Sequence, residues 1–521
     1  MQSQQNMTKM NKQKLIKHHQ WFGLVVGFFL LMFCVSGILL NHRSLILNAN
    51  VSRSLLPSRY EYRDWNGGLL RGTVPIDSAF AAKCVPTDSK RLPSVLIYGA
   101  SGLFVADSAA TEVADFNDGL PSGADYRLIR NALFVGSTQV KTLFAVSPFA
   151  LYRYGAHGTW HKQPIVLADD NERLTDIAAH SDTLVVLSRS HVYIATAPYT
   201  TFRCIALSAP ARYKERTTVF RTIWLLHSGE LFGTVGKLFV DAIAVVIVVL
   251  ILTGFVFFVM KKTRRRWRNK GLQMKHTLLW HDHVGRKTIV ATVLLCATGW
   301  CLRPPVMVLL ALTKTPTIPF TTQSSDNPWH DRLRMIRYDN TANDWLLSAS
   351  DGIYALGAAI DAPRPTLIES APPTNVMGMN VWQQRTDGSW LCGSFSGMHV
   401  WNREKAIAVD YFTGKPSPKK MGAPFGARAV AGYSADFRVP STKKSATDIV
   451  TDYYEGTTAI AQPERLGRLP MSLWNVALEV HSARIYMPNT ATYVFVFLIG
   501  IAAVWCLWTG WRTRLGGGRK H

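Results

Sequence analysis

The chain has 521 residues, of which 48% are hydrophobic and 18% charged, which is apolar for a soluble protein of this length. The formal net charge is +24, yet most of the excess lies in three short segments without acidic residues, 1–20, 261–275 and 511–521. Each of them flanks a long apolar run. This distribution excludes a nucleic-acid partner and indicates a membrane protein.

Four apolar runs are long enough, or nearly so, to cross about 30 Å of hydrocarbon at about 1.5 Å per residue. They are Trp21–Leu40, Ala242–Met260, Thr288–Leu302 with a continuation to Leu312, and Ala491–Trp508. The positive-inside rule places the basic segments in the cytoplasm, which predicts an inner-membrane protein with both termini cytoplasmic. No cleavage site follows the first run, so we expect an uncleaved signal anchor in the lipid bilayer.

The predicted fold class is an integral-membrane α-helical bundle of four transmembrane helices, internally duplicated, with periplasmic β-rich domains. The predicted boundaries are a cytoplasmic N-terminus at 1–20, transmembrane helix 1 at 21–42, periplasmic β-rich domain 1 at 43–222, an outer-mouth segment and transmembrane helix 2 at 223–262, a cytoplasmic basic loop at 263–280, transmembrane helix 3 at 281–312, periplasmic β-rich domain 2 at 313–475, an outer-mouth segment and transmembrane helix 4 at 476–511, and a cytoplasmic tail at 512–521.

Both outer segments contain short runs of β-forming residues joined by tight turns, which predicts β-hairpins. They lie at Val95–Val105, Leu143–Tyr152, Leu184–Ile194, Trp345–Ala355 and Trp390–Val400. Neighbouring copies within a segment are 41 to 48 residues apart, the length of one four-stranded propeller blade. Two arrangements remain open: a single propeller of five or six blades shared by both segments, or two separate β-rich domains.

The cysteines carry little information about function. Cys34, Cys296, Cys301 and Cys506 lie in apolar runs, where small buried side chains are the ordinary interpretation. Cys84 and Cys204 both lie in the first outer segment. A disulfide between them and two unpaired thiols are equally open alternatives.

A histidine motif at the start of the first apolar run is repeated at the start of the third. His19 stands four residues before Gly23, and the run closes on Ser36-Gly37. His281 stands four residues before Gly285, and its run closes on Thr298-Gly299. Both runs are therefore copies of one helix design with a histidine at the cytoplasmic end.

The second and fourth runs have a related signature at their outer ends. His227 precedes the second run, and His481 precedes the fourth in a weaker match that is interrupted by Pro488. Each run closes on Thr-Gly, at Thr253-Gly254 and Thr509-Gly510. The whole unit of helix, outer domain and helix is thus predicted to be duplicated.

The duplication places His19 and His281 in one membrane layer and His227 and His481 in the other. Two histidine pairs, one per leaflet, suit two stacked haems, because imidazole is a common axial ligand of haem iron. The glycines would let a flat macrocycle or a neighbouring helix approach closely. The alternative is that the histidines are interfacial polar residues and the glycines are helix-packing sites.

These motifs resemble the PepSY-associated transmembrane family, which includes inner-membrane siderophore reductases and iron-regulated membrane proteins. The resemblance rests on His19-x-Trp-Phe-Gly, Leu226-His227-x-Gly-x-x-x-Gly, His281-x-x-x-Gly and the Ser-Gly or Thr-Gly pairs, about a quarter of the chain. It implies two b-type haems with iron bound by transmembrane histidines, and an oxidoreductase that reduces ferric siderophores or other ferric complexes in the periplasm. The β-hairpin repeats depart from the α+β outer domains that are typical of the family.

The predicted cytoplasmic segments are too short for a flavin or nicotinamide domain, and they contain no GxGxxG motif. The electron donor is therefore expected to be separate, either a cytoplasmic reductase or membrane quinol, and the acceptor a periplasmic ferric complex. Two other functions remain open: a non-enzymatic, membrane-anchored β-domain that binds a ligand or partner, and a component of a siderophore or metal permease.

Two further residues are candidates at the outer face. His42 follows the first run and is a reserve ligand for the outer haem. Arg303 follows the third run, where it would either pair with haem propionates or act as an interfacial anchor. No catalytic residue is assigned.

Overall fold

The computed structural model describes residues 2–84, 93–136, 141–169, 171–211, 213–262, 271–360, 363–373, 375–419, 426, 428–438, 448–488 and 491–513. The chain forms two compact units, each assembled from separated stretches of sequence. The helical unit comprises Met1–Ile46, Lys214–Ser325 and Leu473–His521. The β-sheet unit comprises Leu47–Tyr213 and Asp326–Ser472.

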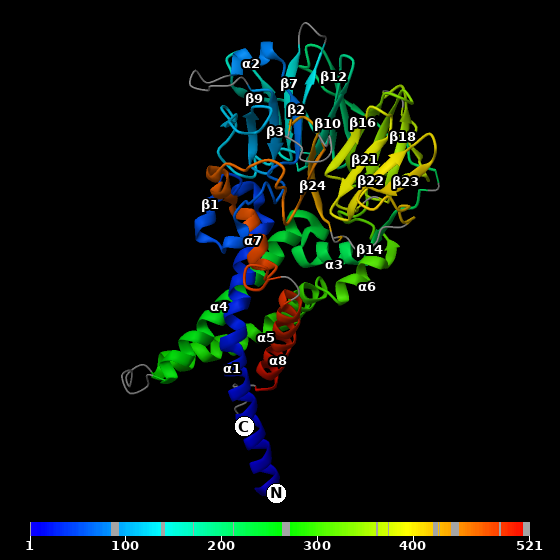
Figure 1. Cartoon of the computed structure of the whole chain (residues 1–521). Helices are drawn as coiled ribbons and strands as arrows, with labels where there is room; N and C mark the ends of the chain where they lie inside the picture. Colours follow the sequence, from blue (N-terminus) through cyan, green and yellow to red (C-terminus); the bar gives the residue numbers. More distant parts are fainter. Residues whose placement is uncertain are drawn as a thin grey trace. The chain divides into compact units, whose positions relative to one another are not determined.

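Four long helices dominate the helical unit (Figure 1). They are α1 (Gln2–Asn41), α4 (Gly233–Lys262), α5 (Gly271–Cys301) and α8 (Ala491–Arg512). Helix α1 begins far before the predicted start at residue 21, because residues 2–20 contain no Gly or Pro and consist largely of good helix formers. The apolar run predicted which part suits the membrane, but not where the helix begins.

Three of these helices are long and apolar enough to cross a membrane, over Lys12–Asn41, Glu230–Met260 and Ala491–Arg512. The predicted third span, 281–312, is instead a broken helix. Helix α5 ends at Cys301, and the short α6 (Val306–Leu312) follows at a bend of 81°. Pro304-Pro305 explains the break, because proline lacks the amide hydrogen and clashes with the preceding turn. Counting this bent pair as one span brings the total to four.

Two short helices precede the second and fourth spans. Helix α3 (Val219–Ser228) starts at Thr218, whose hydroxyl accepts from the Arg221 amide, and ends at Gly229 with φ +78°. Helix α7 (Leu473–His481) leads toward Pro488, after which α8 begins. The first half of the unit therefore provides two long helices and the short α3, and the second half provides two long helices and the short α6 and α7.

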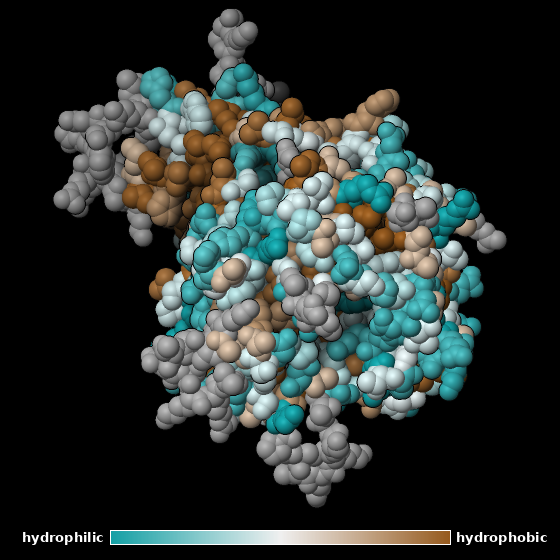
Figure 2. All heavy atoms as spheres, turned by 90° about the horizontal axis from the view of Figure 1, so that it is seen from above, coloured by the Kyte–Doolittle hydropathy of each residue, from teal (hydrophilic) through white to brown (hydrophobic). Residues whose placement is uncertain are grey.

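Apolar side chains cover much of the outside of the long helices. Trp21 is 62% exposed, Val290 78% and Val494 61%. Buried apolar residues in the described part of this unit are few and include Cys34, Ile243 and Ile247. Such a surface suits hydrocarbon rather than water. Figure 2 shows hydrophobic side chains gathered in one area, and a mixed, mostly hydrophilic surface elsewhere.

The β-sheet unit consists mainly of antiparallel sheets. Five four-stranded sheets are formed by β2–β5 (Gly72–Pro75, Val95–Gly99, Gly102–Ala106, Val113–Asp115), β6–β9 (Asn131–Val135, Thr142–Ser147, Ala150–Tyr154, Trp160–Gln163), β10–β13 (Leu174–His180, Thr183–Ser188, Val192–Thr196, Arg203–Ile205), β16–β19 (Leu333–Asp339, Asp344–Ala349, Gly352–Gly357, Thr366–Leu367) and β20–β23 (Val381–Gln384, Trp390–Ser394, Gly397–Asn402, Ile407–Asp410). A two-stranded sheet is formed by β24 (Val430–Ser434) and β25 (Ile449–Asp452). All five predicted hairpins are present.

A short helix and two short pairs of strands are also present. Helix α2 (Ser78–Cys84) follows β2, and β1 (Asn50–Val51) pairs with β26 (Met471–Ser472). In the helical unit β14 (Arg216–Thr218) pairs with β15 (Lys314–Pro316). Both short pairs join residues from the two halves of the chain.

The first strands of the six sheets contact one another in a cyclic order. Strand β2 contacts β6, then β10, β16, β20 and β24 follow in turn, and β24 also contacts β2. Asp176 on β10 accepts hydrogen bonds from Asn131 of β6 and from the Ile336 amide of β16, and it pairs with Arg337. Both predicted outer segments thus contribute to one compact unit, and Asp176 ties them together.

The cysteines agree with their ordinary interpretation. Cys34 and Cys392 are buried thiols, and Cys204 is exposed. The side chain of Cys84 lies outside the described residues, so its pairing with Cys204 stays a prediction.

Candidate functional site

The four predicted histidines lie in the helical unit and meet in two pairs. The rings of His19 on α1 and His281 on α5 have centroids 6.3 Å apart. The rings of His227 on α3 and His481 on α7 have centroids 5.9 Å apart. We call His19 and His281 the first pair, and His227 and His481 the second pair. Each pair joins the two halves of the duplicated chain.

Each histidine packs against a Ser-Gly or Thr-Gly dipeptide of another helix. His281 Nδ1 is 3.0 Å from the Thr253 hydroxyl on α4, and His227 Nδ1 is 3.1 Å from the Thr298 hydroxyl on α5. A Cβ placed on the following glycine would be 3.6 Å from the His281 ring at Gly254, but only 2.8 Å from the His227 ring. Glycine at position 299 therefore leaves the space that the His227 ring occupies.

The other two histidines follow the same plan on α1 and α8. His481 Nδ1 is 2.9 Å from the Phe33 carbonyl oxygen and 3.2 Å from the Ser36 hydroxyl, beside Gly37. His19 Nδ1 is 2.9 Å from the Cys506 carbonyl oxygen, which also accepts the Thr509 hydroxyl.

These hydrogen bonds assign the proton of each ring. A carbonyl oxygen can only accept, so Nδ1 of His19 and of His481 carries the hydrogen. The Thr253 hydroxyl lies 2.9 Å from the Val249 carbonyl oxygen and the Thr298 hydroxyl 2.8 Å from that of Leu294, so each donates there and accepts from its histidine. All four rings thus present an Nε2 lone pair, and no described residue makes a hydrogen bond to any of these Nε2 atoms.

The separation within each pair suits one metal ion between two imidazoles. Two metal–nitrogen bonds of about 2 Å, with about 1 Å more from each nitrogen to its ring centre, give centroids about 6 Å apart. Among the described residues no cluster of three or more His, Cys, Asp or Glu side chains exists. Haem fits this donor set, because the macrocycle supplies four ligands and needs only two axial imidazoles.

Arg303 and His42 differ in their relation to the second pair. The Arg303 guanidinium acts electrostatically on both His227 and His481, and it makes no hydrogen bond or ion pair with a described residue. His42 is not brought into either pair, because its Nε2 lies 2.7 Å from Asp241 Oδ2. Asn41 donates to the other oxygen of Asp241 at 3.0 Å.

Sequence reasoning missed the residues that hold the rings. The dipeptides at Ser36, Thr253, Thr298 and Thr509 were recognised as ends of apolar runs, but their hydroxyls were given no part. Their signal was available, since all four long apolar runs contain Ser-Gly or Thr-Gly near one end.

The β-sheet unit contains a polar cavity of about 290 Å³ among its first strands. Burial lowers the pKa of the Arg71 guanidinium and raises the pKa of the Tyr98 phenol in its wall. Arg71 Nε is buried without a hydrogen-bond partner among the described residues. Asp176 pairs with Arg337 and also acts on Arg71, and Asp436 acts on Tyr98, so charges of both signs surround the cavity.

Comparison with known proteins gives a family but no close relative. The family model described as PepSY-associated TM region matches residues 92–514. No curated protein matches the chain. Two solved structures of the extracellular domain of BT4673 from B. thetaiotaomicron are similar, at 9% and 11% identity, covering 68% and 70% of this chain, with TM-scores of 0.27 and 0.26. The match covers 35% and 40% of those two chains, which is less than half of their length.

Proposed function

The chain belongs to the PepSY-associated TM region family, and from this membership and its two histidine pairs we propose that it is a haem-containing electron-transfer protein of the inner membrane. The observation that carries the proposal is the state of the four rings. In each ring, Nδ1 makes a hydrogen bond to a residue of a neighbouring helix, and Nε2 has no hydrogen-bond partner among the described residues.

The residues around the rings have defined tasks in this proposal. Bound b-type haem supplies one-electron iron chemistry at each pair. The hydroxyl and carbonyl acceptors at Nδ1 fix each ring orientation and raise the basicity of Nε2. Arg303 offers a positive charge to carboxylate groups beside the second pair.

The two pairs are placed for transfer across a bilayer. His19 belongs to α1, while His481 packs on Gly37 of the same helix, 18 residues further along. This corresponds to about 27 Å at about 1.5 Å per residue, close to the thickness of the hydrocarbon core. With the basic ends of the helices in the cytoplasm, the first pair is the cytoplasmic one and the second is periplasmic.

The acceptor in this proposal is a periplasmic ferric complex, such as a ferric siderophore. One electron converts Fe(III) to Fe(II), which oxygen chelators hold more weakly. We assign the β-sheet unit to the periplasm as a six-bladed propeller, on the cyclic order of its sheets. Its polar cavity at Arg71 is the candidate position for the acceptor.

A reduced-minus-oxidised visible spectrum of the purified full chain tests this function. We expect the α-band of b-type haem, with two haems per chain by pyridine haemochrome assay. A folded protein with no haem would contradict the proposal and would leave the membrane-anchored binding domain as the better description.

A further inference from the structure

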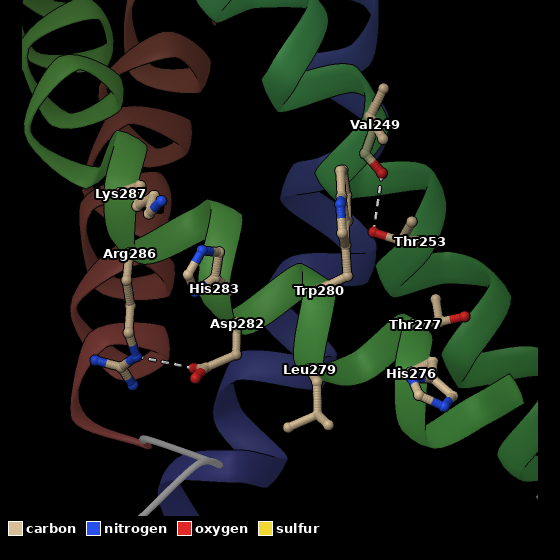
Figure 3. A pocket seen from close by; sticks show the side chains of 10 residues that line it. All are labelled: Val249, Thr253, His276, Thr277, Leu279, Trp280, Asp282, His283, Arg286 and Lys287. Carbon is tan, nitrogen blue, oxygen red and sulfur yellow. Dashed lines mark hydrogen bonds and ion pairs between the residues drawn. The ribbon is translucent and has the colours of Figure 1, made fainter. Parts of the chain in front are cut away.

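A large cavity adjoins the first pair at the end of the helical unit that carries His19 and His281. It has a volume of about 1060 Å³ and is formed by α4 and the N-terminal half of α5. Figure 3 shows the Trp280 side chain of α5 lying toward Val249 and Thr253 of α4. This volume is ample for a drug-sized ligand.

The cavity shares a wall with the first pair. Thr253 lines it, and the same hydroxyl accepts from His281 Nδ1 at 3.0 Å. Trp280 also lines it and precedes His281 directly in the chain. A molecule bound in the cavity would therefore contact Trp280, the residue next to His281 of the first pair.

The walls combine apolar and polar groups in the way an amphipathic ring requires. Leu279 and Trp280 are 40% and 45% exposed. Exposed Leu252 and Val256 continue this apolar surface along α4, which leaves room for a hydrocarbon tail. At the polar side, Arg286 pairs with Asp282 at 3.0 Å and donates to the Trp511 carbonyl oxygen on α8 at 3.1 Å. The exposed side chains of His283 and Lys287 are the polar groups of the wall that a ligand can reach.

We propose that this cavity binds a membrane hydroquinone, which is the electron donor of the protein. The inference rests on the proposed electron-transfer function and names its donor. His283 and Lys287, which are exposed and also line the cavity, provide hydrogen bonds to a ring oxygen. Trp280 provides an aromatic wall, and the tail lies along α4 in the lipid.

The reaction is balanced as follows. The hydroquinone loses two electrons and the protons of its two O–H bonds, and it leaves as quinone. The exposed imidazole of His276 at the rim relays protons to water. The two electrons pass one at a time through the first pair, and they reduce two Fe(III) ions of the acceptor to Fe(II).

Stopped-flow reduction of the haem-loaded full chain by decylubiquinol provides the kinetic test. Dithionite reduction of the same sample shows separately that both haems are present. We expect decylubiquinol to reduce the wild type, and Thr277→Trp, which places a bulky indole at the cavity wall, to slow this reduction at least tenfold. The dithionite spectrum should not change, which shows that the variant folds.

The matched control is Val290→Trp, on an exposed position of the same helix outside the cavity. It should leave the rate unchanged. If dithionite reduces the haems but decylubiquinol does not, or if both tryptophan variants react at the wild-type rate, the hydroquinone proposal is wrong while the electron-transfer function stands. If no haem is present, the proposed function itself fails.

A binding measurement independent of turnover completes the test. An azido-quinone should label α4 or the part of α5 between His276 and Lys287, as located by mass spectrometry after irradiation, and excess decylubiquinone should prevent the labelling. Labelling confined to other helices would overturn the assignment.

Discussion

A buried carboxylate in the β-sheet unit and four part-buried histidines in the helical unit have their hydrogen bonds arranged in different ways. In the β-sheet unit, Asp176 accepts hydrogen bonds from both neighbouring sheets and is paired with Arg337. In the helical unit, each of the four histidines has one ring nitrogen bonded and the other without a partner among the described residues.

This difference separates polar residues that hold a fold from those that wait for a ligand. Removing a polar group whose hydrogen bonds are all made should destabilise its unit and leave haem binding unchanged. Removing a histidine whose Nε2 has no partner among the described residues should abolish haem binding and hardly change the stability of the fold. Four predictions test this distinction, from the largest expected effect to the smallest.

The largest effect is expected for His281→Ala and His227→Ala. Each variant removes one axial ligand of one pair, so haem content should fall from two per chain to about one. The pyridine haemochrome assay measures it. His18→Ala is the matched control, because the His18 ring packs on Phe22 and Trp505 outside both pairs. Equal losses in the control would contradict the assignment of the pairs.

Asp176→Ala should destabilise the β-sheet unit by about 1–3 kcal/mol, because it removes the buried acceptor of the Ile336 amide and the partner of the half-buried Arg337. Limited proteolysis of this unit in increasing urea measures the loss, and the haem spectrum should stay unchanged. Glu61→Ala breaks the exposed pair with Arg63 and should cost at most about 1 kcal/mol. A haem loss in Asp176→Ala would show that the two roles are not separate.

The glycines beside the rings predict a graded series. A Cβ would lie 2.8 Å from the His227 ring at Gly299, 3.2 Å from the His481 ring at Gly37 and 3.6 Å from the His281 ring at Gly254. Overpacking costs about 1–3 kcal/mol, so haem retention on dilution should fall most in Gly299→Ala, less in Gly37→Ala and least in Gly254→Ala. Gly23→Ala, whose Cβ would meet only Cys506, is the control. A different order would argue against the ring positions.

The smallest effect is expected for Thr298→Val, which removes the acceptor at His227 Nδ1. Loss of such a partner typically weakens metal binding about tenfold or more. Haem titration of the second pair measures the change, and Thr298→Ser, which keeps the hydroxyl, should restore most of the affinity. Equal affinities for the valine variant and the wild type would show that this hydroxyl has no part in holding the ring.

Much of the fold could be predicted from local patterns. Apolar runs predicted the long helices, and alternating β-forming residues predicted the five hairpins, because both depend on residues close in sequence. The break at Pro304-Pro305 was visible in the sequence, yet the apolar continuation to Leu312 favoured a single helix. The cyclic order of the sheets depends on contacts such as Asp176 with Arg337, which are far apart in the chain.

The sequence by itself singled out four histidines: His19 and His281 by their identical offsets from glycine, and His227 and His481 by their places before the second and fourth apolar runs. An offset sets the depth of a residue along a helix, but not the neighbour that its side chain meets. Only the tertiary structure decided that each ring packs on a Ser-Gly or Thr-Gly pair of another helix, with Nδ1 bonded there. That packing rather than the spacing leaves His19 facing His281 and His227 facing His481, each with an Nε2 lone pair that no described residue uses.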